Sequence, residues 1–160
     1  MKTPFMMILC GSLMLLGACG KQESTAAAGT PGGPKAFEIT ANDTMKFSVT
    51  RLEVSAGEDV KVTLTNIGMQ PKQAMGHNWT LLKKDADPAA FANAAVTHQA
   101  QDYFPEELAG EVIARIKLLG PKQSDTVEFK APTEPGEYPF LCTFPGHFIA
   151  GMKGVLVVHY

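Results

Sequence analysis

The sequence predicts an all-β fold, in which residues 37–160 form one β-sandwich. Apolar and polar side chains alternate with a period of two over residues 60–65 and again over residues 126–130, as in strands with one buried face. Turn-forming residues separate the apolar runs, namely Gly57, Pro121, Pro132 and Gly136. Several short strands at this spacing are typical of a sandwich or barrel, and a length of 160 residues favours one domain.

Further strands are expected from apolar runs on either side of these two. Those before residue 60 contain Phe37, Ile39, Phe47, Val49, Leu52 and Val54. Those after it cover residues 77–82, 113–119, 138–142 and 154–160. Tyr138, Phe140 and Cys142 share one face of their strand because successive side chains alternate. Their bulk predicts that this face is buried and that Cys142 points inward at the end of the strand.

One segment near residues 87–104 breaks the alternation and predicts a helical insertion. Asp87 and Pro88 fit an N-cap followed by proline at the first helical position. Residues 89–104 are rich in alanine and place apolar side chains at helical spacing. Pro105 is expected to end the helix.

The first 18 residues predict an export signal. Lys2 gives a positive start, and residues 5–18 are uncharged and mostly apolar, which fits a secretory signal peptide but is shorter than the roughly 20 residues of a membrane-spanning helix. Residues 16–19 resemble the lipobox of bacterial lipoproteins, which implies that Cys19 becomes the first residue and carries lipid. The alternative is a plain secretory signal cut near Ala18, with Cys19 a free thiol. In both cases the mature protein leaves the cytoplasm.

Residues 19–36 are expected to be a flexible tether between this lipid and the domain. Residues 20–35 are rich in Gly, Ala, Pro, Ser and Thr and contain no large apolar side chain, so they cannot bury enough surface to offset the entropy lost on ordering. As a coil they would span about 20–24 Å. The sequence thus predicts a domain anchored at the periplasmic or other extracytoplasmic face of a bacterial membrane. The alternative is that these residues are a disordered terminus that does not serve as a tether.

Charge and cysteine content exclude two classes of protein. With 14 basic and 16 acidic residues, the chain lacks the basic surface of a nucleic-acid-binding protein. Its three cysteines are too few for a disulfide scaffold. Cys10 lies in the predicted signal and Cys19 is the predicted lipid site, so Cys142 is the one thiol left for the fold.

Cys142 belongs to a set of four side chains typical of a copper site. A turn at Pro145 and Gly146 follows it, then His147 and, after four more residues, Met152. One loop can therefore bring three donors to one end of the sandwich, and His77 far upstream supplies the fourth. Two imidazoles, a thiolate and a weak thioether are the ligands of blue-copper electron-transfer centres, whereas structural zinc sites use Cys and His without a thioether.

Each of these residues also has an ordinary alternative. Cys142 alone would be a buried structural cysteine, or a nucleophile paired with His147, although residues 143–152 contain no Asp, Glu or Asn to orient such a base. His77 alone would be a histidine with satisfied hydrogen bonds, and Met152 alone would fill the core. All four at this spacing favour the metal site.

The segments that hold these donors resemble those of azurin. Residues 75–79, Met-Gly-His-Asn-Trp, and residues 142–147, Cys-Thr-Phe-Pro-Gly-His, are similar to its two copper-binding segments. Residues 42–47 and 113–129 are similar as well. The resemblance implies the cupredoxin fold, an eight-stranded Greek-key sandwich with a helical flap that matches the insertion near residues 87–104.

The resemblance also implies the roles of individual residues around one copper ion. His77, Cys142 and His147 would be strong equatorial ligands. Met152 and the carbonyl of Gly76 would be weak axial ligands. Asn78 and the backbone amide of Phe144 would form hydrogen bonds near the Cys142 sulfur.

Two features depart from azurin. Four residues, rather than three, separate His147 from Met152, and this longer loop resembles that of auracyanin, a membrane-associated relative. The disulfide near one end of the azurin sandwich cannot form here, because the mature chain lacks the cysteines for it. Packing must therefore stabilise that end.

The sequence predicts a membrane-tethered carrier of single electrons. It does not predict an enzyme, because it supplies one mononuclear ligand set and no second one. The resemblance implies that one copper-binding histidine reaches the surface inside a hydrophobic patch. Phe148 and Ile149 follow His147 and are expected to enlarge this patch, which would dock redox proteins as donors and acceptors. No nucleic acid and no small-molecule substrate are expected as partners. The alternatives are a copper-trafficking or storage protein, an electron-delivering subunit of a larger complex, and a copper-free binding domain.

Overall fold

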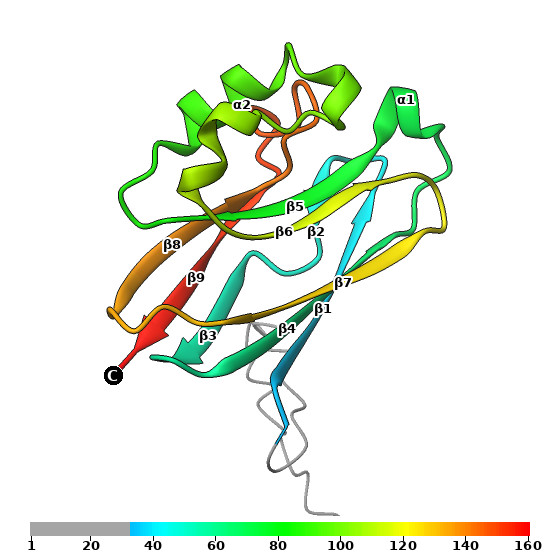
Figure 1. Ribbon diagram of the computed structural model, residues 1–160. Coiled ribbons are helices and arrows are strands. Elements are labelled where there is room, and N and C mark those ends of the chain that lie inside the picture. Colours follow the sequence, from blue (N-terminus) through cyan, green and yellow to red (C-terminus); the bar gives the residue numbers. More distant parts are fainter. Residues whose placement is uncertain (1–32) are drawn as a thin grey trace, which may run out of the picture.

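A computed structural model describes residues 33–160 of the chain as a sandwich of two facing sheets (Figure 1). Nine strands lie in these residues: β1 (Lys35–Asn42), β2 (Lys46–Phe47), β3 (Arg51–Ser55), β4 (Asp59–Asn66), β5 (His77–Leu82), β6 (Val112–Leu119), β7 (Ser124–Lys130), β8 (Gly136–Leu141) and β9 (Lys153–His159). The connections hold two helices, α1 (Lys72–Met75) and α2 (Pro88–Ala95), and two 3-10 turns, Gln99–Gln101 and Glu106–Glu111. The predicted all-β sandwich is confirmed.

The order of the strands requires the chain to cross between the sheets. One sheet has the order β2-β1-β4-β7 and the other the order β3-β9-β8-β5-β6. β1 with β4 and β3 with β9 are parallel pairs, which no hairpin can connect. β1 begins at Lys35, two residues before the expected start of the domain at residue 37. It runs from the end where the chain enters the fold to the end where α1 and α2 lie (Figure 1).

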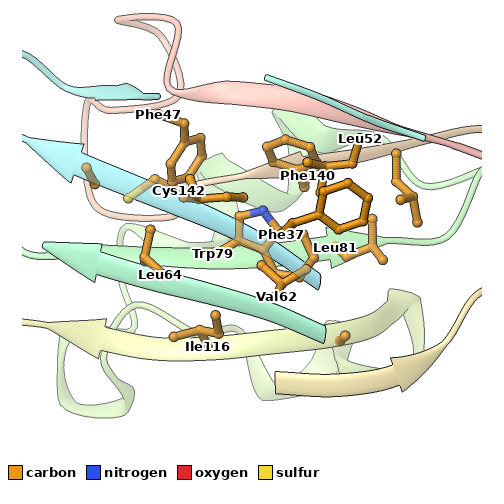
Figure 2. Close-up of a cluster of buried hydrophobic side chains, with 14 of the residues drawn as sticks. Phe37, Phe47, Leu52, Val62, Leu64, Trp79, Leu81, Ile116, Phe140 and Cys142 are labelled. Atoms are coloured by element: carbon orange, nitrogen blue, oxygen red, sulfur yellow. The ribbon is translucent and has the colours of Figure 1, made fainter. Parts of the chain in front are cut away.

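Apolar side chains from both sheets fill the space between them (Figure 2). The alternation in residues 60–65 correctly predicts the buried face of β4, whose three apolar side chains are 0% exposed. The ring of Trp79 on β5 lies 5.4 Å from that of Phe140 on β8. Cys142 belongs to the same cluster, as strand alternation predicts (Figure 2). Each large side chain buried in this way contributes about 1.5–3 kcal/mol to stability.

The helical insertion forms, but its helix is shorter than expected. The Asp87 carboxylate accepts a hydrogen bond from the Ala89 amide over 2.8 Å, which confirms the predicted N-cap. The helix ends at Ala95 instead of continuing to Phe104. The carbonyl of Ala94 accepts hydrogen bonds from the side chains of Thr97 and His98 over 3.2 and 2.9 Å. Such side-chain bonds compete with helical ones, so the expected continuation is wrong beyond Ala95.

The predicted signal, the lipid site at Cys19, and most of the tether lie outside the described residues. None of the helices within residues 33–160 is long and apolar enough to cross a membrane.

Candidate metal centre

The four donors predicted from the sequence lie on two separate segments of the chain. His77 is the first residue of β5, Cys142 follows the last residue of β8, and Met152 precedes the first residue of β9. His147 lies in the loop between β8 and β9. This loop is at the same end of the molecule as α1 and α2 (Figure 1). All four side chains are buried.

Three of these side chains bring their donor atoms together. A ring nitrogen of His77, a ring nitrogen of His147 and the sulfur of Cys142 all lie within 4.8 Å of one another. Cys142 Sγ is 3.4 Å from His147 Nδ1, and the centroids of the two imidazole rings are 5.0 Å apart. The exposed fraction is 0% for His77 and Cys142 and 2% for His147. A metal ion bound between these atoms would be shielded from water.

His77 lacks the hydrogen bonds that a buried polar side chain needs. Neither Nδ1 nor Nε2 of its ring has a hydrogen-bond partner, whereas roughly 90% or more of buried polar groups have one. Leaving such a group unpaired costs about 1–3 kcal/mol. Among the described residues, the other buried side-chain atom of this kind is Nε1 of Trp79. A metal ion would give the His77 ring its missing partner, so the residues present fit the metal that their donor set implies.

The loop that carries the other donors is folded by its own backbone. Gly146 and Gly151 have φ angles of 82° and 91°, which glycine adopts without the steric cost of a Cβ. The amide of Met152 donates to the carbonyl of His147 over 2.9 Å. The amide of Cys142 donates to the carbonyl of Met152 over 3.1 Å, which closes the loop where β8 and β9 end and begin. The backbone thus sets the spacing of the three donors.

Asn78, directly after His77, joins the two donor segments. Its Oδ1 accepts from the Thr143 amide over 2.8 Å, and its Nδ2 donates to the Thr143 hydroxyl over 2.6 Å. The Thr143 hydroxyl in turn donates to the carbonyl of Tyr103 over 2.7 Å. Sequence analysis singled out Asn78 but missed Thr143 and Tyr103. The position of Thr143 beside Cys142 was the one signal that could have drawn attention to it.

Comparison with known proteins assigns this fold and donor set to a family. Residues 35–159 match the family described as copper binding proteins of the plastocyanin/azurin family. The chain belongs to this family. The predicted resemblance to azurin and auracyanin, the cupredoxin fold and copper as the cofactor are thereby confirmed.

Individual cupredoxins are similar over most of the chain. Auracyanin-B of Chloroflexus aurantiacus is 34% identical over 145 residues, which cover 84% of this chain and 60% of auracyanin-B. An azurin of Achromobacter denitrificans is 37% identical over 123 residues, covering 74% of this chain and 80% of the azurin. The structure of reduced auracyanin from Roseiflexus castenholzii matches with a TM-score of 0.70 at 33% identity, covering 78% of this chain and 97% of that one. The chain therefore spans less than two thirds of auracyanin-B but nearly the whole of the Roseiflexus auracyanin.

Burial keeps the Cys142 thiol of this cupredoxin protonated in the absence of a metal ion. Burial raises the pKa of the Cys142 thiol to about 11, and the backbone amides of Asn78 and Phe144 oppose part of this rise. The resemblance implies hydrogen bonds near the sulfur from Asn78 and the Phe144 amide, and these roles stay predictions. Because a thiol must lose its proton to bind a metal ion, Cys142 would release this proton on metal binding.

The two histidines are neutral and available as ligands. Burial, with a smaller effect from the neighbouring His77, lowers the pKa of His147 to about 4. Burial also lowers the pKa of His77, against weaker opposing effects of the Asp43 carboxylate and of the Asn42 carbonyl, which lies near the ring but outside hydrogen-bonding geometry. Metal binding requires neutral imidazole, so neither ring has to lose a proton at pH 7.

The two predicted axial ligands, Met152 and Gly76, lie next to the other donors in the chain. Met152 is 0% exposed at the start of β9. At Gly76, before His77, an added Cβ would lie 2.7 Å from the Lys72 carbonyl oxygen and 2.9 Å from Leu118 Cγ. This lack of space explains the glycine. The roles of both residues as ligands stay predictions.

Proposed function

We propose that this cupredoxin is a one-electron carrier with a single type 1 copper centre. His77, Cys142 and His147 would hold the copper, with Met152 and the Gly76 carbonyl as weaker ligands. The observation that carries the proposal is the buried group of three donors in which both nitrogens of His77 are unpaired. When bound, copper supplies a reversible one-electron change between Cu(II) and Cu(I).

The residues of the chain contribute by holding the donors in place and by excluding water. His77 is fixed by strand β5, and the other donors are fixed by the hydrogen bonds of their loop and by Asn78. Donors that cannot move limit the rearrangement that accompanies gain of an electron. Catalytic metal sites keep an open position for substrate, whereas these three donors are at most 2% exposed. This burial favours a carrier over an enzyme.

The surface next to His147 is the proposed contact for redox proteins. His147 itself is only 2% exposed, so its neighbours, and not its own ring, supply the exposed apolar surface expected there. Ile149 is 85% exposed, and Phe148 is half-buried beside it. Exposed apolar side chains that adjoin a donor residue suit the small interfaces of electron-transfer encounters. Replacing Phe148 or Ile149 by serine should slow electron transfer to a native partner. An unchanged rate in both variants would place the contact elsewhere.

We further propose export and lipid attachment at Cys19, which would hold the domain through residues 19–36 at the extracytoplasmic face of a bacterial membrane. The support comes from the sequence of the first 36 residues. A full-length chain with Cys19→Ala should not incorporate labelled palmitate and should leave the membrane fraction. Cys10→Ala is the matched control and should keep both properties. Labelling of Cys19→Ala would contradict the assignment.

Copper titration tests the metal centre directly. Residues 20–160 mixed with Cu(II) should develop the intense blue thiolate-to-copper absorption, and Cys142→Ser should abolish it. Met152→Leu should keep the colour and shift the reduction potential, while His159→Gln, on the surface, should change neither. A colourless complex of the unmodified protein would rule out a type 1 centre.

The same material distinguishes a carrier from a copper-trafficking protein. A carrier should retain copper in the presence of a chelator and exchange electrons rapidly with a redox partner. A trafficking protein should release copper to the chelator readily. The buried donors favour retention.

A further inference from the structure

Two consecutive residues near the metal centre have a backbone conformation that costs free energy. Asp102 and Tyr103 have φ angles of 54° and 58°, in the left-handed region. Asp visits this region more readily than most residues, but a bulky residue such as Tyr is an outlier there. The cost is about 1–2 kcal/mol per residue. Such strain persists only where the surrounding structure holds the residues in place.

The contacts of Tyr103 show what holds it. Its amide donates to the His98 carbonyl over 2.8 Å, and its carbonyl accepts from the Thr143 hydroxyl over 2.7 Å. Its ring packs edge-on against Phe144, with centroids 5.0 Å apart and an interplanar angle of 65°. Tyr103, which is 8% exposed, therefore contacts both of the residues that directly follow Cys142.

These two contacts lead to the copper ligands by short routes. Thr143 is bonded through its amide and its hydroxyl to the side chain of Asn78, the neighbour of His77. The ring of Phe144 lies 4.6 Å from the ring of His147. Thr143 therefore links Tyr103 to Asn78, and Phe144 links Tyr103 to His147.

Asp102 connects the same turn to the segment before His77. Its carboxylate lies 3.0 Å from the ammonium group of Lys72, the first residue of α1. The two side chains are 44% and 36% exposed, so this ion pair contributes at most about 1 kcal/mol. Asp102 therefore contributes more through its backbone than through this ion pair. Because Asp tolerates the left-handed region, it allows the turn that brings Tyr103 into contact with the loop.

We propose that the Asp102–Tyr103 turn positions the copper centre, with Tyr103 as a positioning residue. It fixes Thr143 and Phe144, and through them the Cys142–His147 loop relative to His77. The inference rests on the proposed copper function. Its consequence is that loosening the turn changes the copper centre although every donor is still present.

A pair of variants at Tyr103 provides the main test. Tyr103→Phe keeps the ring that packs on Phe144, so the copper-loaded protein should keep the reduction potential, absorption spectrum and copper-release rate of the unmodified protein. Tyr103→Ala removes the ring. We expect a shifted potential, a changed ratio of the absorption bands and faster release of copper to a chelator. If Tyr103→Phe keeps the properties that Tyr103→Ala loses, the ring positions the loop and the hydroxyl is not needed.

A second pair tests the hydrogen-bond route. Thr143→Val keeps the shape of the side chain but removes the hydroxyl that contacts Tyr103 and Asn78, so it should shift the same three quantities. Thr143→Ser should restore them. The double variant Tyr103→Ala with Thr143→Val should change them by an amount that differs from the sum of the single effects, because residues in contact are energetically coupled.

Several outcomes decide the proposal. If Tyr103→Ala takes up copper with unchanged potential, spectrum and release rate, the proposal is overturned. If this variant does not fold, Thr143→Val takes its place, and an unchanged potential, spectrum and release rate in that variant would equally overturn the proposal. In the copper-free protein, Tyr103→Ala should speed hydrogen exchange at the Thr143 amide, a readout without copper. An unmodified protein that never turns blue would instead refute the proposed function.

Discussion

The two segments that carry the donors are held in different ways. His77 lies in a sheet, where it pairs with Leu119 of β6, and every residue of β5 is buried. The segment from Cys142 to Met152 is a loop whose shape depends on two glycines and on contacts from distant residues. The strand fixes its donor by the general packing of the fold. The loop can be adjusted by single contacts, so the properties of the copper centre should depend mainly on the loop.

The largest expected effect is the acid sensitivity of the copper-free protein. The pKa of His147 is about 4 in the folded state, against 6.5 for an ordinary histidine, so the folded state binds fewer protons than the unfolded state. Stability is therefore full above about pH 6.5 and falls as the pH approaches 4. At about 1.4 kcal/mol per pKa unit, the loss from His147 is on the order of 3 kcal/mol.

Urea denaturation of the copper-free protein at pH 7 and pH 4.5 measures this loss. His147→Asn should reduce the dependence on pH, whereas His159→Gln, on the surface, should leave it unchanged. The same pH dependence in His147→Asn as in the unmodified protein would show that the loop histidine is not responsible.

Glycine substitutions compare the two segments directly. Gly76→Ala places a methyl group too close to the Lys72 backbone carbonyl and to the Leu118 side chain, so that one of them must shift, which should cost about 1–3 kcal/mol. It should also weaken copper binding by shifting His77. Gly146→Ala meets no atom within 4 Å, so it should cost only the strain of its φ angle, about 1 kcal/mol.

Urea denaturation and copper titration of both variants test this difference. A larger loss of stability and of copper affinity in Gly146→Ala than in Gly76→Ala would show that the loop, and not the strand segment, is the rigid part.

The smallest expected effect is at Lys46, which supports the loop from outside. Its ammonium group donates a hydrogen bond to the carbonyl of Ala150, and the side chain is exposed. Lys46→Gln should speed copper release to a chelator about two- to five-fold, equivalent to about 0.5–1 kcal/mol. The matched control is Lys130→Gln, whose ion pair with Asp59 lies on β7 and β4. Equal release rates in the two variants would mean that Lys46 does not stabilise the loop.

Residue types and spacing predicted His77, Cys142 and His147, whose donor atoms the structure brings together, while the role of Met152 as a ligand stays a prediction. Three of the four predicted donors lie in a short segment whose order, Cys, then His, then Met, is unusual, and alternation marked the strand that delivers Cys142 to the core. The contacts that support them could not be predicted in this way. Tyr103 contacts Thr143 across 40 positions and Lys46 contacts Ala150 across 104, and in both cases the acceptor is a backbone carbonyl, which every residue type offers.

The end of α2 illustrates a second limit of prediction from the sequence. Composition favoured a helix up to Phe104, because alanine is common throughout the segment. Two side chains that bond the Ala94 carbonyl ended the helix at Ala95. The residues that follow then form the turn at Asp102 and Tyr103, so the failure of the simple helix prediction marks the part of the insertion that contacts the copper loop.

The direction of β1 determines how an anchored domain would face its surroundings. The strand starts at the end of the sandwich opposite the donors and finishes beside them, and at about 3.3 Å per residue its 8 residues span about 26 Å. With lipid on Cys19, as proposed, the membrane would lie behind the domain and the Ile149 surface would point outward. Adding the 20–24 Å expected of residues 20–35, the electron-exchanging face would stand about 46–50 Å from the bilayer. It would then meet soluble proteins or large projecting domains more readily than partners that lie flat in the membrane.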